Sequence, residues 1–197
     1  METPTPGSSP KIDRRKLRYE LLRDESQIPT TFDSGEPEID DFILTKEALE
    51  FERDSEGRTS LVFLNGELVA YYTISSDSLR SEYVESKKLS GAYKKAKKEK
   101  LEVYPALKIG RLGVQRPWHR RGVGTAIVRR VVAIAVRGPA ATRFITLRAK
   151  PPAVPFYQAL GFEMTLEVHR ERGKINRTMY LDTLPLRDAV LDGWDYS

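Results

Sequence analysis

The stretch His119-Arg120-Arg121-Gly122-Val123-Gly124-Thr125 decides the fold of this chain. It lies between a strand-like run, Leu107 to Val114, and a helix-like run, Thr125 to Val136. A strand, a glycine-containing turn and a helix in this order point successive backbone N–H groups at an anion. The helix start adds about half a positive charge, and the two arginines add forked donors that suit phosphate oxygens. The stretch therefore predicts binding of a phosphorylated ligand.

Two commoner phosphate loops do not fit this stretch. The Walker pattern requires a Lys-Ser or Lys-Thr pair after its second glycine, whereas Gly124 is followed by Thr125-Ala126. The dinucleotide pattern requires a third small residue three positions further on, and Ile127 occupies that position. Two glycines before a helix can also form only a tight, closely packed turn. The residues of this stretch alone leave that alternative open.

The composition excludes several classes of site. The 197 residues include no cysteine, so disulfides, thiolate chemistry and cysteine zinc sites are excluded. The two histidines, His119 and His169, are far apart in the sequence, and we therefore expect no metal site. No apolar run approaches the roughly 18 residues of a membrane span, and the N-terminus lacks the apolar segment of a signal peptide. We expect one domain in a cytoplasmic protein.

The positive charge is concentrated in one segment. The net charge is +5 and the isoelectric point is near 9.3, which favours anionic partners. A lysine-rich insert over residues 79–100 can be a solvated helix or loop, or a nucleic-acid-binding surface with Tyr83 and Tyr93 able to stack on a base. The candidate nucleic-acid-binding residues in it are Lys87, Lys88, Lys94, Lys95, Lys97 and Lys98.

Hydrophobic patterning predicts a mixed α/β (α+β) domain over residues 14–183. A disordered tail, residues 1–13, precedes it, and a C-terminal tail of undetermined structure, 184–197, follows it. Asn65-Gly66 between two apolar, β-branched runs is a strong hairpin signal. The predicted strands are 17–22, 59–64, 67–74, 107–114, 144–149, 162–168 and 178–181, and the predicted helices are 36–51, 125–136 and 155–160, with the insert helical or partly flexible.

Two segments resemble the GNAT superfamily of acetyl-CoA-dependent N-acetyltransferases. Leu112-Gly113-Val114 followed by His119 to Gly124 is similar to the Arg/Gln-x-x-Gly-x-Gly/Ala motif of that family. Phe156-Tyr157-Gln158-Ala159-Leu160-Gly161-Phe162 is similar to its Phe-Tyr-x-x-x-Gly-Phe ending. The resemblance implies a mixed, mostly antiparallel central sheet flanked by helices and splayed between the fourth and fifth strands.

The resemblance also implies a set of residues that bind acetyl-CoA. His119 stands where the family usually has Gln or Arg, so a long side chain over the pyrophosphate is lost while the backbone contacts remain. The two arginines of the turn belong to the same set. The implied cofactor-binding residues are Leu112, Gly113, Val114, His119, Arg120, Arg121, Gly122, Val123, Gly124, Thr125, Ala149 and Phe156.

Two catalytic roles follow from the resemblance. The backbone N–H of Val114 would stabilise the oxyanion of the tetrahedral intermediate, and Tyr157 would be the general acid that protonates the leaving thiolate. Alternatively, Tyr157 only packs against the cofactor. No carboxylate lies from Leu107 to Gln115, where some members of the family keep a general base. Since an α-amine has a lower pKa than a lysine side chain, this absence favours an α-amine acceptor.

A narrower resemblance concerns the acceptor. The segments Phe32-Asp33-Ser34-Gly35, Tyr71 to Ser75 and Tyr104-Pro105-Ala106 look like those of GNAT toxins from bacterial toxin–antitoxin pairs. Such toxins acetylate the amino group of aminoacyl-tRNA, block translation and pair with a small ribbon-helix-helix antitoxin. A homodimer is a further expectation. The alternatives are acetylation of a protein or small-molecule amine, and a non-catalytic nucleic-acid-binding module on the same fold.

Overall fold

The structure, a computed structural model, describes residues 11–85, 101–166, 169–171 and 174–192. The six candidate nucleic-acid-binding lysines of the insert lie outside the described residues, as do residues 1–10 of the predicted N-terminal tail. Within the described part, no helix has the length and apolar character needed to cross a bilayer.

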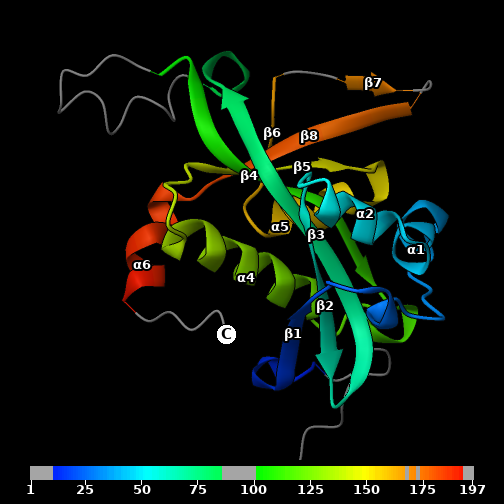
Figure 1. Cartoon of the computed structure of the whole chain (residues 1–197). Coiled ribbons are helices and arrows are strands. Elements are labelled where there is room, and N and C mark those ends of the chain that lie inside the picture. Colours follow the sequence, from blue (N-terminus) through cyan, green and yellow to red (C-terminus); the bar gives the residue numbers. More distant parts are fainter. Residues whose placement is uncertain (1–10, 86–100, 167–168, 172–173, 193–197) are drawn as a thin grey trace, which may run out of the picture. The chain divides into compact units, whose positions relative to one another are not determined.

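The strands form a mixed sheet whose order is β1-β2-β3-β4-β5-β8-β6, with β7 paired to β8 (Figure 1). The β4–β5 pair is parallel, whereas β1–β2, β5–β8, β6–β8 and β7–β8 are antiparallel. The predicted mixed, mostly antiparallel sheet is therefore confirmed. The strands are β1 (Leu17–Leu21), β2 (Arg58–Leu64), β3 (Glu67–Arg80), β4 (Val103–Val114), β5 (Phe144–Ala149), β6 (Glu163–Met164), β7 (His169–Glu171) and β8 (Lys174–Asp182).

The first predicted helix is divided in the structure. A single helix to Phe51 was wrong, because two helices separate at Thr45, whose backbone is extended and whose hydroxyl accepts the N–H of Glu47. Threonine competes in this way with helical hydrogen bonds and favours caps. The α-helices are α1 (Pro37–Leu44), α2 (Glu47–Arg53), α4 (Val123–Arg137), α5 (Val154–Ala159) and α6 (Arg187–Leu191). The 3₁₀ helices are η1 (Arg14–Lys16), η2 (Glu25–Gln27), η3 (Ser81–Tyr83), η4 (Arg116–Trp118), η5 (Pro151–Ala153) and η6 (Leu184–Leu186).

The chain divides into two compact units. The first holds the described residues up to Thr73 together with Arg111–Arg130, and the second holds Ile74–Gly110 and the described residues from Val131 to Asp192. The strands β3 and β4 and the helix α4 each begin in one unit and end in the other. Each unit has its own buried core.

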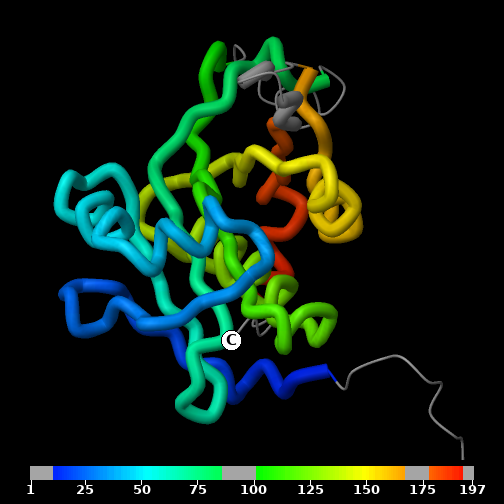
Figure 2. The backbone as a smooth tube through the Cα atoms, turned by 90° about the vertical axis from the view of Figure 1, so that its right-hand side faces the viewer, coloured from blue at the N-terminus to red at the C-terminus, as the bar shows by residue number. Residues whose placement is uncertain are grey.

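In the first unit, α1 and α2 pack on β2 and β3. Phe42 and Ile43 of α1 are fully buried with Leu61 of β2 and Tyr71 of β3. The loop from β1 to α1, blue in Figure 2, adds Phe32, whose ring lies edge-on to Tyr71 at 5.3 Å. The Tyr71 hydroxyl donates to the Ile39 carbonyl at 2.5 Å. This core fixes α1 against the middle of β3.

In the second unit, aromatic rings pack edge to face across β4, β5 and β8. The Phe144 ring lies 5.5 Å from that of Tyr104 and 5.7 Å from that of Tyr180. Leu79 of β3 belongs to the same buried cluster. We predicted that β3 ends at Ile74, which was wrong, because the strand continues to Arg80. The insert, predicted to be helical or partly flexible from about Leu79, therefore starts after this strand, and its residues 86–100 lie outside the described residues.

The strand β4 is irregular in two ways that bear on the site. The N–H of Gln115 donates to the Val69 carbonyl at 2.9 Å, and the N–H of Ser81 donates to the Glu102 carbonyl at 2.8 Å. From one bond to the other, the chain segment containing β3 advances 12 residues, from 69 to 81. The segment containing β4 advances 13 residues, from 102 to 115. The β4 segment therefore carries one extra residue, as in a β-bulge.

The second irregularity is the end of the β4–β5 ladder. The parallel pairing ends at Ile109↔Leu147, although β4 continues to Val114 and β5 to Ala149. Among the described residues these two strand ends are not paired with each other, which agrees with the predicted splay between the fourth and fifth strands.

Candidate functional site

The chain leaves β4 through a turn that is held by backbone hydrogen bonds. Gln115 donates its N–H to Val69 on β3, and Arg116 donates its N–H to the Asp33 carbonyl, each at 2.9 Å. The guanidinium of Arg116 also contacts the Asp33 carboxylate at 2.9 Å. Pro117 then allows the single turn of η4 because its missing N–H is not needed there. The end of β4 is thus fixed on two sides within the first unit.

The turn exposes successive backbone donors at the start of α4. Arg120 and Gly122 have positive φ angles of 59° and 92°, which redirect the chain into the helix. The first helical hydrogen bond runs from the Ala126 N–H to the Gly122 carbonyl at 3.0 Å. The N–H groups of residues 123–125 precede it and have no acceptor within the helix. Such donors are left at the start of any α-helix and can bind an anion.

His119 contacts β4 rather than the start of α4. Its Nε2 lies 2.7 Å from the carbonyl oxygen of Val114. A carbonyl only accepts, so Nε2 carries the proton and donates it. The imidazole therefore ties the turn to the residue whose N–H was predicted to stabilise an oxyanion.

The two arginines of the turn are placed differently. Arg120 is exposed, whereas the guanidinium of Arg121 lies 5.0 Å from the Trp118 ring centre. The Nε of Arg121 is buried and has no hydrogen-bond partner in the described part of the chain. The Arg121 carbonyl accepts the N–H of Ile12 at 3.0 Å. The segment just before β1 is therefore hydrogen-bonded to the turn.

Gly113 is required by packing as well as by its predicted backbone role. A Cβ at this position would lie 2.7 Å from Ile39 Cγ2 and 2.8 Å from Tyr71 Cε1. Such contacts are shorter than real side chains show, so only glycine lets α1 approach β4 so closely. Leu112 and Val114, on either side, are half-buried.

The second unit carries the other predicted residues. Ala149 is the last residue of β5, and after η5 the helix α5 holds Phe156 and Tyr157. The Tyr157 ring is buried between Phe156, 4.9 Å away, and Phe162, 5.5 Å away. Burial raises the pKa of Tyr157 to about 12. Among the described residues its hydroxyl has no hydrogen-bond partner, so a protonated phenol is available to another group.

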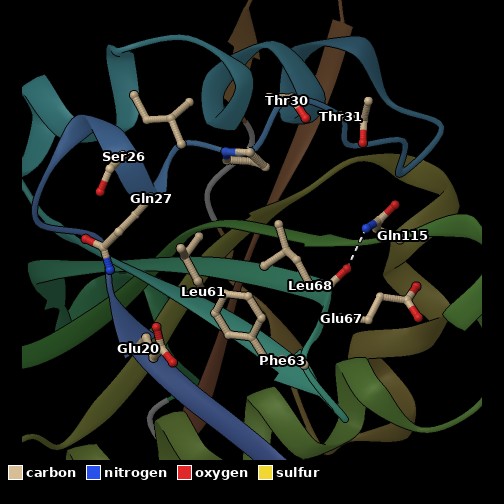
Figure 3. Close-up of a pocket in the computed structure, with 13 residues that line it drawn as sticks. Glu20, Ser26, Gln27, Thr30, Thr31, Leu61, Phe63, Glu67, Leu68 and Gln115 are labelled. Atoms are coloured by element: carbon tan, nitrogen blue, oxygen red, sulfur yellow. Dashed lines mark hydrogen bonds between the residues drawn. The ribbon is translucent and has the colours of Figure 1, made fainter.

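An open groove of about 640 Å³ in the first unit borders the end of β4 (Figure 3). Its apolar lining includes Leu61, Phe63 and Leu68, and Glu20 and Glu67 also line it. The Gln115 amide donates to the Leu68 carbonyl, as the dashed line in Figure 3 marks. Two carboxylates disfavour a phosphate, so the start of α4 remains the phosphate-binding candidate.

The predicted residues therefore form two groups. The first unit brings together Leu112 to Val114 and His119 to Thr125, and the second brings together Ala149, Phe156 and Tyr157. Sequence reasoning missed the anchoring roles of Gln115 and Arg116. It also missed a hydrogen bond from the Thr146 hydroxyl to the Asp77 carboxylate. The only signal for Asp77 was the alternation Thr73, Ser75, Asp77, Leu79, which continues β3 beyond its predicted end.

The sequence matches the family described as "Acetyltransferase (GNAT) domain" over residues 40–181. The chain belongs to the GNAT acetyltransferase family. The predicted enzyme class is thereby confirmed, and the turn before α4 and the helix α5 both lie inside the matched region. A comparison with curated proteins found no match.

Solved structures of GNAT toxins share this fold. A bacterial toxin superposes with a TM-score of 0.71 at 21% identity, covering 90% of this chain and 94% of that one. AtaT complexed with acetyl-methionyl-tRNAfMet gives 0.69 at 22% identity, covering 88% and 98%. A tyrosine-to-phenylalanine mutant of AtaT, bound to the C-terminus of the antitoxin AtaR and to acetyl-CoA, gives 0.65 at 17% identity, covering 88% and 98%. The last of these holds the co-substrate predicted for this chain.

Proposed function

We propose that this GNAT protein transfers the acetyl group of acetyl-CoA to the amino group of an aminoacyl-tRNA. The observation that carries the donor half is the turn before α4, where the N–H groups of residues 123–125 are left without helical acceptors. These donors suit the pyrophosphate of coenzyme A. Arg120, exposed on the same turn, adds charge that suits the same anion.

Two residues are proposed to act on the reacting atoms. The Val114 N–H stabilises the oxyanion, and the His119 imidazole holds that residue in place through the Val114 carbonyl. Tyr157 donates its phenolic proton to the departing thiolate. Because burial raises the pKa of Tyr157 to about 12, the acid form is fully populated at neutral pH.

The aminoacyl-tRNA acceptor rests on similarity and on the chain's charge. The neighbour AtaT is described in complex with acetyl-methionyl-tRNAfMet, and the net charge of +5 suits a polyanionic acceptor. AtaT is also described bound to its antitoxin AtaR. We propose that this chain is likewise a cytoplasmic toxin with an antitoxin partner. A protein or small-molecule amine is the second candidate acceptor, favoured by the absence of any described feature that reads a nucleotide base.

Labelled acetyl-CoA tests both candidates in one experiment. The protein is incubated with labelled acetyl-CoA and a mixture of aminoacyl-tRNAs, peptides and free amines, and the label is followed in each fraction. We expect it on aminoacyl-tRNA. Label on peptides or amines with none on tRNA would reject the toxin proposal. No label in any fraction, together with no thermal shift on adding acetyl-CoA, would reject acetyl transfer altogether.

A further inference from the structure

In the second unit, a carboxylate and a hydroxyl contact each other from two strands that are separated by one strand. The Thr146 hydroxyl of β5 donates to Oδ2 of Asp77 on β3, and β4 lies between those strands in the sheet. Thr146 is 3% exposed and Asp77 is half-buried. The two side chains therefore meet over β4. Among the described residues, the other carboxylate oxygen of Asp77 has no hydrogen-bond partner.

A buried apolar and aromatic cluster borders this pair. Leu79 follows Asp77 by two residues and Phe144 precedes Thr146 by two, so alternation along each strand places them on the same face as the pair. Tyr180 of β8 is the register partner of Thr146 and lies on that face as well. Leu79, Phe144 and Tyr180 belong to one buried cluster. The carboxylate of Asp77 therefore lies beside a packed aromatic core.

Among the described residues, Asp77 forms no ion pair. Lys108 is the register partner of Thr146 on β4 and is half-buried, yet it forms no ion pair with a described residue. The Tyr180 hydroxyl donates to Oε2 of Glu163 on β6 at 3.2 Å, which adds a second carboxylate beside the aromatic cluster. Asp77 thus keeps one carboxylate oxygen without a described ion-pair partner.

The pair also lies beside the point where β4 and β5 stop pairing. The residue pair Lys108↔Thr146 is followed by the pair Ile109↔Leu147, which is the last pair of the parallel β4–β5 ladder. Beyond it, the N–H and carbonyl groups of β4 have no partner on β5 among the described residues. A ligand entering at the end of the ladder would come next to Asp77.

We propose that Asp77, held by Thr146, is the binding site for the acceptor's primary ammonium group and the base that removes its proton. The free carboxylate oxygen receives the ammonium, and the buried cluster of Leu79, Phe144 and Tyr180 fixes the strands that carry Asp77 and Thr146. This assignment supplies the base that is absent from Leu107 to Gln115. It rests on the acetyl transfer proposed above.

The proton balance of the reaction is complete with these groups. The ammonium gives one proton to the Asp77 carboxylate, and the neutral amine forms a C–N bond to the thioester carbonyl. As the intermediate collapses, the C–S bond breaks and the thiolate takes the proton of Tyr157. The nitrogen loses its second proton to Tyr157, which is thereby restored, and Asp77 releases its own proton to water. The products are the acetylated amine, free coenzyme A and one proton.

The test compares kcat/KM for the acceptor with the affinity for acetyl-CoA. The acceptor is methionyl-tRNA, or the amine that the labelling experiment identifies. We expect Asp77→Asn to lower kcat/KM for the acceptor by a factor of about 100 or more, with the dissociation constant of acetyl-CoA and the melting temperature unchanged. Thr146→Val should lower kcat/KM for the acceptor by a smaller factor. Thr146→Ser keeps the hydroxyl and should therefore keep kcat/KM near the wild-type value.

A matched control is available on the same strand. Thr73, also on β3, forms a buried hydroxyl contact with Thr59 at 2.8 Å, and Thr73→Val should leave kcat/KM for the acceptor within about twofold of wild type. The inference is overturned if kcat/KM for the acceptor in Asp77→Asn stays within threefold of that of an active wild type. It is also overturned if the decrease in kcat/KM is matched by a decrease in acetyl-CoA affinity or in stability. A wild type that acetylates no amine would instead reject the proposed function.

Discussion

The strands β4 and β5 end in similar ways but present different groups. Each is followed by a proline-containing 3₁₀ helix, Arg116–Trp118 or Pro151–Ala153, and then by an α-helix. After β4, positive φ angles at Arg120 and Gly122 separate the two helices and leave backbone donors open. After β5, the 3₁₀ helix runs straight into α5, and the phenol of Tyr157 is buried.

This difference separates two kinds of sensitivity. A site built from backbone N–H groups depends on the path of the chain, so replacing side chains there should matter less than straining φ. A site built from one buried hydroxyl depends on that single group. Substitutions at the two strand ends should therefore affect different measurable quantities.

The largest expected effect is at the β5 end. Tyr157→Phe removes the proposed acid while keeping the ring between Phe156 and Phe162, so turnover should fall by a factor of about 100 or more. The affinity for acetyl-CoA should stay within about threefold of wild type. Steady-state rates and a binding titration measure the two quantities. Full turnover in the variant would assign Tyr157 to packing only.

The same tyrosine should contribute to stability at high pH. Its pKa is raised to about 12 in the folded state from an ordinary 10.0, so the unfolded chain loses the proton first. The stabilisation is present below pH 10 and lost as pH rises towards 12, by roughly 1.4 kcal/mol per unit of pKa difference. Denaturation curves at pH 9, 10 and 11 should show a steeper loss for wild type than for Tyr157→Phe. Parallel losses would contradict the burial argument.

A smaller effect is expected at Gly122, at the β4 end. A Cβ there meets nothing within 4 Å, but its φ of 92° strains any other residue. Gly122→Ala should weaken acetyl-CoA binding by roughly tenfold, in line with about 1–2 kcal/mol of left-handed strain. Gly66→Ala is the matched control, since Gly66 has a φ of 85° and equally open space in the β2–β3 hairpin. Equal loss of affinity in both variants would mean that only stability was measured.

The smallest expected effect is at His119. His119→Ala removes one hydrogen bond to the Val114 carbonyl, worth about 0.5–1.5 kcal/mol. We expect kcat to fall by no more than about tenfold, and His119→Gln, which keeps a donor, to fall less. Rates of the two variants at saturating acetyl-CoA give the comparison. A loss as large as that of Tyr157→Phe would make His119 a direct participant in proton transfer.

The sequence allowed the β4 end to be predicted better than the rest of the site. A turn depends on local residues, so Gly122 and the start of α4 were visible in the sequence, as was the Asn65-Gly66 hairpin. The Asp77–Thr146 contact joins residues 69 positions apart, and no local pattern specifies such a pairing. The polar run Ser75-Ser76-Asp77-Ser78 also hid the second half of β3, because strand propensity ignores the partners that β4 supplies.

The hydrogen bond from Ile12 to the Arg121 carbonyl has a practical consequence for handling this protein. The chain ahead of β1 is coupled to the turn that is proposed to receive the pyrophosphate. Trimming past Ile12, or fusing a bulky affinity tag close to it, would alter a contact of that turn while leaving every conserved-looking motif intact. Shortened and full-length chains should therefore be compared for coenzyme affinity before either is used as a reference.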